Sequence, residues 1–198
     1  MLSLYEKCNW EYLKERDFMN VAKPLKFYTL KEFEKLPRED GWNYELIDGL
    51  VMMSPRPAGA HQMISGNLFS ELRSKLRGKG CAPLLEMDLV LENDNLIPDL
   101  MVICDDVNIS ELKRYEKAPK IVIEIVSPKS ASHDCIVKRH KYEQLGISEY
   151  WIVSPEENCV DVFCFTLNKH EHCCTGQVKS YVLPDLQIDL DNIFDLSF

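Results

Sequence analysis

Glu124 lies in the middle of an otherwise apolar and largely β-branched segment, Ile121–Val126. A short apolar run that ends at Ser127 and Pro128 is typical of a strand that is buried on both faces. A carboxylate in such a strand is costly unless a cation, a metal ion or a substrate pairs with it. Glu124 is therefore the first residue of this sequence for which we expect a chemical role.

Three more polar residues could join Glu124 in a site. Asp99 precedes a second short apolar segment, Glu45 lies in a strand-like segment near the start of the domain, and Lys138 lies on a predicted helix. Carboxylates from neighbouring strands supply the hard oxygen ligands that Mg²⁺ prefers, and Mn²⁺ can substitute. A bound metal activates water and polarises a phosphodiester, and a nearby lysine can orient or deprotonate that water. The set predicts metal-dependent phosphodiester hydrolysis.

Each of these residues also has a simpler explanation when it is taken alone. Asp99 follows a proline, as in many turns, and an alternating strand would place Glu45 in solvent. Lys138 is four residues after Asp134, which is the spacing of a solvated helix pair worth roughly 0.2–0.5 kcal/mol. The combination of the residues, rather than any one of them, favours a site.

Four further residues are candidates for contacts with a substrate. Arg139 and Lys141 lie beside Lys138 and are placed to approach phosphates. Tyr142 shares the helix face of Lys138, where packing is the simpler role. His61 opens a predicted helix, and for it a helix cap, a substrate contact and a structural role are all open.

A group of cysteines and histidines near the C-terminus raises the question of zinc. It consists of Cys159, Cys164, His170, His172, Cys173 and Cys174. The group lacks the paired Cys-x-x-Cys spacing of many zinc sites, and alternate residues of the predicted hairpin face opposite sides. Both features argue against zinc. The eight cysteines of the chain are scattered, and we expect free thiols.

Length and composition limit the class of protein. With 198 residues, 45% of them hydrophobic and 28% charged, the chain fits one globular domain with a real core. No apolar run is long enough for a membrane span, and the charged N-terminal residues do not resemble a signal peptide. We therefore expect a cytoplasmic protein without a membrane partner. The net charge of −9 argues against broad, non-specific nucleic-acid binding but allows a local basic groove.

The predicted elements form one α/β domain, residues 27–198, after a helical appendage of residues 1–26. The chain begins this domain with a capping box, in which Thr29 is followed by Glu32. The later elements are a hairpin of Tyr44–Ile47 and Leu50–Met53, a helix Ala60–Arg77, strands Leu84–Leu91, Leu100–Cys104 and Ile121–Val126, a helix Ser132–Leu145, a strand Tyr150–Val153, and a hairpin of Val160–Leu167 with Val178–Leu183. This order predicts a central mixed β-sheet flanked by helices.

Several motifs of this sequence resemble the Uma-two family of restriction-endonuclease-like proteins in the PD-(D/E)XK nuclease superfamily. They are Asn43–Gly49, Met53–Pro55 with His61 and Gln62, Ile97–Leu100, Glu124–Pro128, Asp134 with Lys138 and Tyr142, and Gly146–Val153. The resemblance covers the chain from Tyr28 to the C-terminus with the motifs in the family order. It implies a restriction-endonuclease-like fold.

The resemblance also implies roles for the site residues. It makes Asp99 and Glu124 the metal-binding pair, with the backbone carbonyl of Ile125 as a further ligand. The lysine that usually stands two residues after the second acid is absent, and Lys138 on the following helix takes its place. Glu45 matches an additional acidic position of the family, and we expect it to assist catalysis as an outer or second-metal ligand.

The leading hypothesis is a Mg²⁺-dependent deoxyribonuclease that cuts DNA as an endonuclease. A homodimer is expected, because cutting both strands requires two sites. One alternative is a non-catalytic module that keeps the fold and binds nucleic acid or protein. Another is a metal-dependent hydrolase that acts on a smaller phosphate ester.

Overall fold

The main feature of the computed structural model is a six-stranded sheet in the order β10-β9-β8-β7-β6-β3. Residues 26–57, 59–127 and 133–197 are described, so the predicted appendage of residues 1–26 lies almost wholly outside them. The strands are β3 (Ala82–Leu85), β6 (Leu100–Ile103), β7 (Ile121–Ile125), β8 (Glu149–Ser154), β9 (Cys159–Cys164) and β10 (Lys169–Cys173). Only β7 and β8 pair in parallel within this sheet, so the predicted mixed sheet is confirmed.

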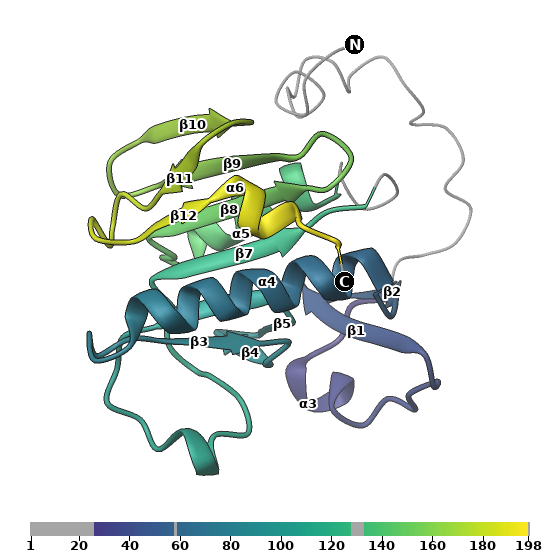
Figure 1. Ribbon diagram of the computed structural model, residues 1–198. Helices are drawn as coiled ribbons and strands as arrows, with labels where there is room; N and C mark the ends of the chain where they lie inside the picture. Colours follow the sequence, from purple (N-terminus) through teal and green to yellow (C-terminus); the bar gives the residue numbers. More distant parts are fainter. Residues whose placement is uncertain (1–25, 58, 128–132, 198) are drawn as a thin grey trace.

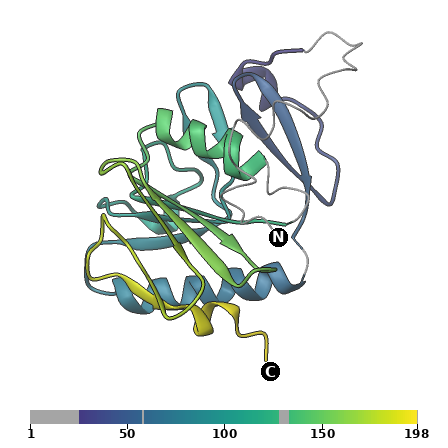
Figure 2. The same cartoon turned by 90° about the horizontal axis from the view of Figure 1, so that it is seen from above.

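Helices cover both faces of this sheet (Figures 1 and 2). One face carries α4 (Gly59–Leu76) and α6 (Leu190–Phe194), and the other carries the π-helical turn η2 (His133–Lys138) and α5 (Arg139–Gln144). The long helix α4 buries Ile64, Leu68 and Leu72 in one core with Ile123 and Trp151. Residues of opposite parity on the strands, such as Val122, form the second core with Tyr142 of α5. None of the described helices is long and apolar enough to cross a membrane.

A second, four-stranded sheet lies beside the first in the order β2-β1-β5-β4. Its strands are β1 (Trp42–Ile47), β2 (Leu50–Pro55), β4 (Leu89–Leu91) and β5 (Asp94–Leu96), preceded by the short helix α3 (Leu30–Phe33). The predicted capping box of Thr29 and Glu32 is present at α3. The β1–β2 turn has positive φ at Asp48 (52°) and Gly49 (77°), as a tight hairpin requires. Glu45 lies on β1 of this sheet, and its carboxylate contacts Lys138 of η2.

Three predicted elements differ from the structure. Val160–Leu167 was expected to pair with Val178–Leu183, but β9 pairs with β10, a polar edge strand without an alternating apolar pattern. The segment around Val178 instead forms a separate ribbon of β11 (Gln177–Lys179) and β12 (Gln187–Asp189). The segment Leu84–Leu91 is broken at Glu86, where φ is 43°. The predicted helix Ser132–Leu145 is described from His133 and begins as a π-helix.

The prediction of free thiols is wrong for four cysteines. Disulfides join Cys81 to Cys104 and Cys159 to Cys174. Each pair lies one position beyond a registered pair of antiparallel residues, Ala82 with Ile103 and Val160 with Cys173. The sulfur atoms therefore meet across neighbouring strands, which a count of spacings along the sequence does not reveal. Among the described residues, Cys164 and Cys173 are free and buried.

Glu149, at the start of β8, is a fully buried carboxylate and gives the fold a testable pH dependence. It accepts hydrogen bonds from Trp151 Nε1 (2.7 Å) and from the backbone N–H groups of Tyr181 (2.7 Å) and Val182 (3.2 Å). Burial nevertheless raises the pKa of Glu149 above its ordinary 4.5. The folded state therefore holds this proton more tightly than the unfolded state, and stability falls as the pH rises through the interval between the two pKa values.

We expect Glu149→Gln not to show this loss of stability with rising pH, because glutamine does not titrate. In urea denaturation at a series of pH values, the wild type should lose free energy of unfolding relative to Glu149→Gln as the pH rises above 4.5. A difference between the two proteins that does not change with pH would contradict this assignment.

Candidate functional site

Asp99 and Glu124 lie opposite each other on neighbouring strands. The last registered pair of β6 and β7 is Leu100 with Ile123, and continuing this antiparallel register places Asp99 across from Glu124. Opposed residues of an antiparallel pair share one face of the sheet. Asp99 also holds the strand end, because its Oδ2 accepts a hydrogen bond from the backbone N–H of Ile125 at 2.7 Å. The two predicted acidic residues are therefore neighbours in the fold.

His61, in the first turn of α4, contacts the same carboxylate. Its Nε2 lies 3.1 Å from Asp99 Oδ2. Burial alone would lower the pKa of His61, but the hydrogen bond and the charge of Asp99 outweigh it and raise this pKa. Of the three roles open for His61, the structure therefore supports the positioning of Asp99. The sequence held no signal for this contact, since the two residues are 38 positions apart.

Glu124 is buried and accepts hydrogen bonds from side chains of η2 and α5. Its Oε1 accepts hydrogen bonds from Lys138 Nζ at 3.0 Å and from the hydroxyl of Tyr142 at 2.7 Å. Burial and the charges of Glu124 and Glu45 raise the pKa of Tyr142 well above 10, so the phenol remains a proton donor. Tyr142 is fully buried and thus positions Glu124 rather than meeting a substrate.

Lys138 connects Glu124 with Glu45. Its Nζ lies 3.0 Å from Glu45 Oε2 as well as 3.0 Å from Glu124 Oε1, and all three side chains are less than 10% exposed. The other oxygen of Glu45 accepts the backbone N–H of Ile97 at 2.8 Å. The solvent-facing alternative for Glu45 is therefore wrong. The side chain of Asp134 lies outside the described residues, so its predicted pairing with Lys138 is not described.

Lys141 points to a different pair of carboxylates. Its ammonium binds Asp48 at the β1–β2 turn and Asp94 at 3.0 Å, and the side chain is 8% exposed. Asp94 in turn accepts the backbone N–H of Asp48 at 2.7 Å. We had expected Lys141 to approach phosphates, but these two partners give it a role in joining α5 to the smaller sheet. The sequence did not reveal this cluster, because both aspartates lie in connections between the predicted strands.

We expect Lys141→Met to destabilise the protein without removing the site. The change leaves Asp94 buried without its cation, and breaking a buried pair in this way costs about 3–5 kcal/mol. Urea denaturation at neutral pH measures the loss. The exposed Lys120 is the matched control, for which Lys120→Met should change stability by less than about 0.5 kcal/mol. Equal effects of the two substitutions would contradict the role of Lys141.

Arg139 is half-buried at the start of α5, with its guanidinium 5.0 Å from the centre of the Phe163 ring. It follows Lys138 directly in the chain. Its contact with a phosphate stays a prediction.

The composition of this site fits a hard divalent cation. Asp99, Glu124 and Glu45 supply three carboxylates, and the ammonium of Lys138 and the ring of His61 contact them. Within the part of the chain that the structure describes, both contacts of Asp99 use its Oδ2 atom. The Oδ1 atom is therefore available to a metal ion. Oxygen donors and an excess of negative charge are the features that Mg²⁺ and Mn²⁺ require.

Comparisons with known proteins identify the family and the fold of this chain. The model of the Uma2 family, described as "Putative restriction endonuclease", matches residues 30–191. Among solved structures, the crystal structure of "a putative nuclease belonging to DUF820" from Anabaena variabilis is similar, with a TM-score of 0.72 and 22% identity over 84% of this chain and 97% of that chain. At this identity the likeness establishes the fold alone. A comparison with curated proteins finds no match.

Proposed function

Because this chain belongs to the Uma2 family of restriction-endonuclease-like proteins, we propose that it is a metal-dependent endonuclease that hydrolyses DNA phosphodiester bonds. The observation that carries the proposal is the buried ammonium of Lys138 between Glu124 and Glu45, beside Asp99. A fold does not need this arrangement for its stability, because buried ion pairs seldom stabilise more than an apolar core would.

Asp99, Glu124 and the backbone carbonyl of Ile125 are the groups that we assign to the metal, which we propose to be Mg²⁺ with Mn²⁺ as a substitute. When bound, such a cation lowers the pKa of water and stabilises the negative charge that develops on a phosphodiester. His61 positions Asp99 through the contact at 3.1 Å, and Tyr142 positions Glu124 through the hydrogen bond at 2.7 Å.

Lys138 is the residue that we assign to the attacking water. Its ammonium carries protons that can orient a water molecule, and its two carboxylate partners hold the side chain in place. Glu45 thus acts through Lys138 as a positioning residue. Arg139, beside this lysine, is the candidate contact for a DNA phosphate.

We also expect DNA to require the metal for binding, because of the carboxylates in the site. Three negative side chains in one site repel a phosphodiester, and a divalent cation removes this repulsion. Double-strand cutting further requires two such sites. We therefore propose a homodimer, which light scattering in solution tests directly.

The experiment that tests the function is the incubation of purified protein with supercoiled plasmid in Mg²⁺, in Mn²⁺ and in EDTA. We expect nicked or linear DNA with either metal and intact plasmid in EDTA. Intact DNA under all three conditions, for single- and double-stranded substrates alike, would contradict the proposal and favour a binding module.

A further inference from the structure

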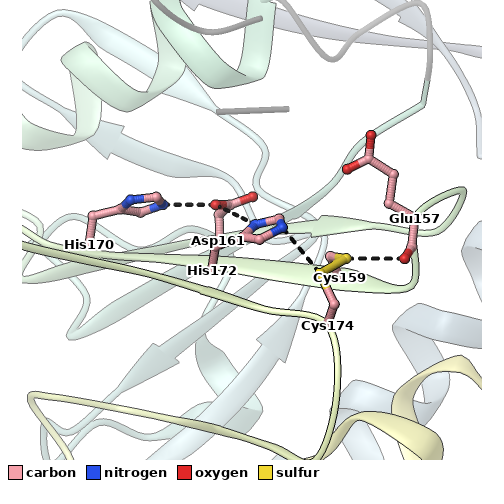
Figure 3. The surroundings of a disulfide bond; sticks show 6 residues. All are labelled: Glu157, Cys159, Asp161, His170, His172 and Cys174. Carbon is pink, nitrogen blue, oxygen red and sulfur yellow. Dashed lines mark hydrogen bonds and ion pairs between the residues drawn. A yellow bond between two sulfur atoms is a disulfide. The ribbon is translucent and has the colours of Figure 1, made fainter. Parts of the chain in front are cut away.

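A second cluster of cysteine, histidine and aspartate side chains lies on the β9–β10 hairpin (Figure 3). The register pairs Asp161 with His172 and ends with Val160 opposite Cys173. Its continuation by one position pairs Cys159 with Cys174. Alternate residues of a strand share a face, so these four side chains project from the same side of the hairpin. The same alternation turns Cys164 and Cys173 to the opposite side. It therefore selects a compact group from the cysteines and histidines of this region.

The ligand atoms of this group are close enough to hold one ion. The Sγ atoms of Cys159 and Cys174 and a ring nitrogen of His172 lie within 4.8 Å of one another. Nε2 of His172 is 3.1 Å from Cys174 Sγ, and Cys159 and Cys174 are joined as a disulfide. Two sulfur atoms and one imidazole nitrogen are the donor set of many zinc sites.

Asp161 fixes the histidine ring in the orientation that a metal needs. Its carboxylate, which is 2% exposed, lies 2.9 Å from Nδ1 of His172 (Figure 3). A carboxylate acceptor requires a proton on Nδ1, so Nε2 of a neutral ring presents its lone pair toward the sulfur atoms. Carboxylate–histidine–metal arrangements of this kind are the usual support of zinc-binding imidazoles.

His170 lies near this cluster but has other contacts. Its Nε2 is 2.8 Å from the same oxygen of Asp161, and its ring stacks on Phe163 with centroids 4.4 Å apart. We therefore do not count His170 as a ligand. The fourth coordination position is left to solvent.

We propose that the reduced protein binds Zn²⁺ through the thiolates of Cys159 and Cys174 and Nε2 of His172, with Asp161 as the positioning residue. A dithiol reductant transfers two electrons and two protons to the disulfide, breaks its S–S bond and closes to its own disulfide. Zn²⁺ then displaces the two thiol protons and forms two zinc–sulfur bonds. The same pair of strands is thus cross-linked by a disulfide when oxidised and by zinc when reduced.

The proposed zinc site is independent of the nuclease site, although both lie on the same face of the main sheet. The register places Glu124, Ile152, Asp161 and His172 in one row across four strands. With neighbouring strands about 4.8 Å apart, Asp161 is roughly 10 Å from Glu124 along this row. Thiolate ligation distinguishes the two sites, because the groups that we assign to the metal of the nuclease site include no sulfur.

The test is a titration of the reduced full-length protein with Co²⁺, a spectroscopic substitute for zinc. We expect a sulfur-to-cobalt charge-transfer band that saturates at one equivalent and disappears when Zn²⁺ is added. Cys174→Ser and His172→Ala should abolish or greatly weaken the band. Asp161→Asn should weaken the affinity about 10- to 100-fold while the band at saturation is retained.

Cys173→Ser is the matched control, because Cys173 is the chain neighbour of Cys174 with its side chain on the opposite face. Burial raises the pKa of Cys173 to about 11, so this thiol is a poor ligand at neutral pH, and the band should persist in its variant. It should also persist in Cys81→Ser/Cys104→Ser and in Glu124→Gln.

Two results would overturn the proposal. One is the absence of a thiolate band in the reduced wild type, and the other is a band that survives in Cys174→Ser. Alkylation gives a second measurement that does not depend on cobalt. Zn²⁺ should protect Cys174 from a maleimide in the reduced wild type but not in His172→Ala, and equal protection in both proteins would contradict the assignment of His172.

Discussion

Replacing Glu124 with glutamine is expected to reduce Mg²⁺-dependent DNA cleavage by at least about 100- to 1,000-fold, which is the effect of removing one preorganised hydrogen-bond donor from an active site. Glutamine has the same shape and can still accept the hydrogen bond of Tyr142, so the fold should persist. The variant lacks the negative charge of the carboxylate that we assign as a metal ligand. The measurement is the rate of plasmid nicking at saturating Mg²⁺, together with a circular dichroism spectrum.

Glu156→Gln provides the control for this experiment, since Glu156 is exposed on the turn between β8 and β9. Its cleavage rate should equal that of the wild type. Cleavage that is unchanged in Glu124→Gln would show that the activity resides elsewhere. The assignment of Glu124 to the site would then be wrong.

Lys138→Met should affect both stability and catalysis. The ammonium is 7% exposed and lies between two buried carboxylates, so its removal leaves two negative charges facing each other. Breaking a buried ion pair from one side typically costs about 3–5 kcal/mol, and here two pairs are broken at once. We expect a lower urea midpoint and no detectable cleavage at temperatures where the variant remains folded.

A double-mutant cycle separates these two effects. Glu45→Gln removes one of the repelling charges, so Lys138→Met/Glu45→Gln should recover a large part of the stability that Lys138→Met loses. Cleavage should not recover, because the group that orients water is still missing. Recovered cleavage would show that Lys138 acts only through the fold, and additive stability losses would show that the two side chains are not coupled.

The sequence predicted that an acidic pair and a lysine would lie close together, and their roles stay predictions. A carboxylate in an apolar strand is a strong local signal, because the energetic penalty is visible in the residue types alone. The central strands and the helices on both sides followed from hydrophobic periodicity, and Asp99, Glu124 and Lys138 lie together as expected. Glu45 was a candidate from its place in a strand-like segment, and the resemblance to the family supported it.

The contacts that were missed depend on which strands become neighbours. His61 and Asp99 are 38 positions apart, and no pattern in either segment points to the other. The sequence shows the charge of Lys141 but not its burial, and the charge alone predicted a contact with phosphates. The edge strand β10 has a polar, exposed sequence, so its pairing with β9, and with it the Cys159–Cys174 bond, could not be predicted from periodicity.

The most direct test of the account is a calorimetric titration of the metal-free protein with Mg²⁺. If Asp99 and Glu124 hold the cation, the wild type and the exposed-site control Asp106→Asn should bind Mg²⁺ with equal affinity. Asp99→Asn and Glu124→Gln should show no binding at the same concentrations. Binding by Asp99→Asn with the affinity of the wild type, or the absence of binding by the wild type itself, would contradict the assignment of this site to a metal.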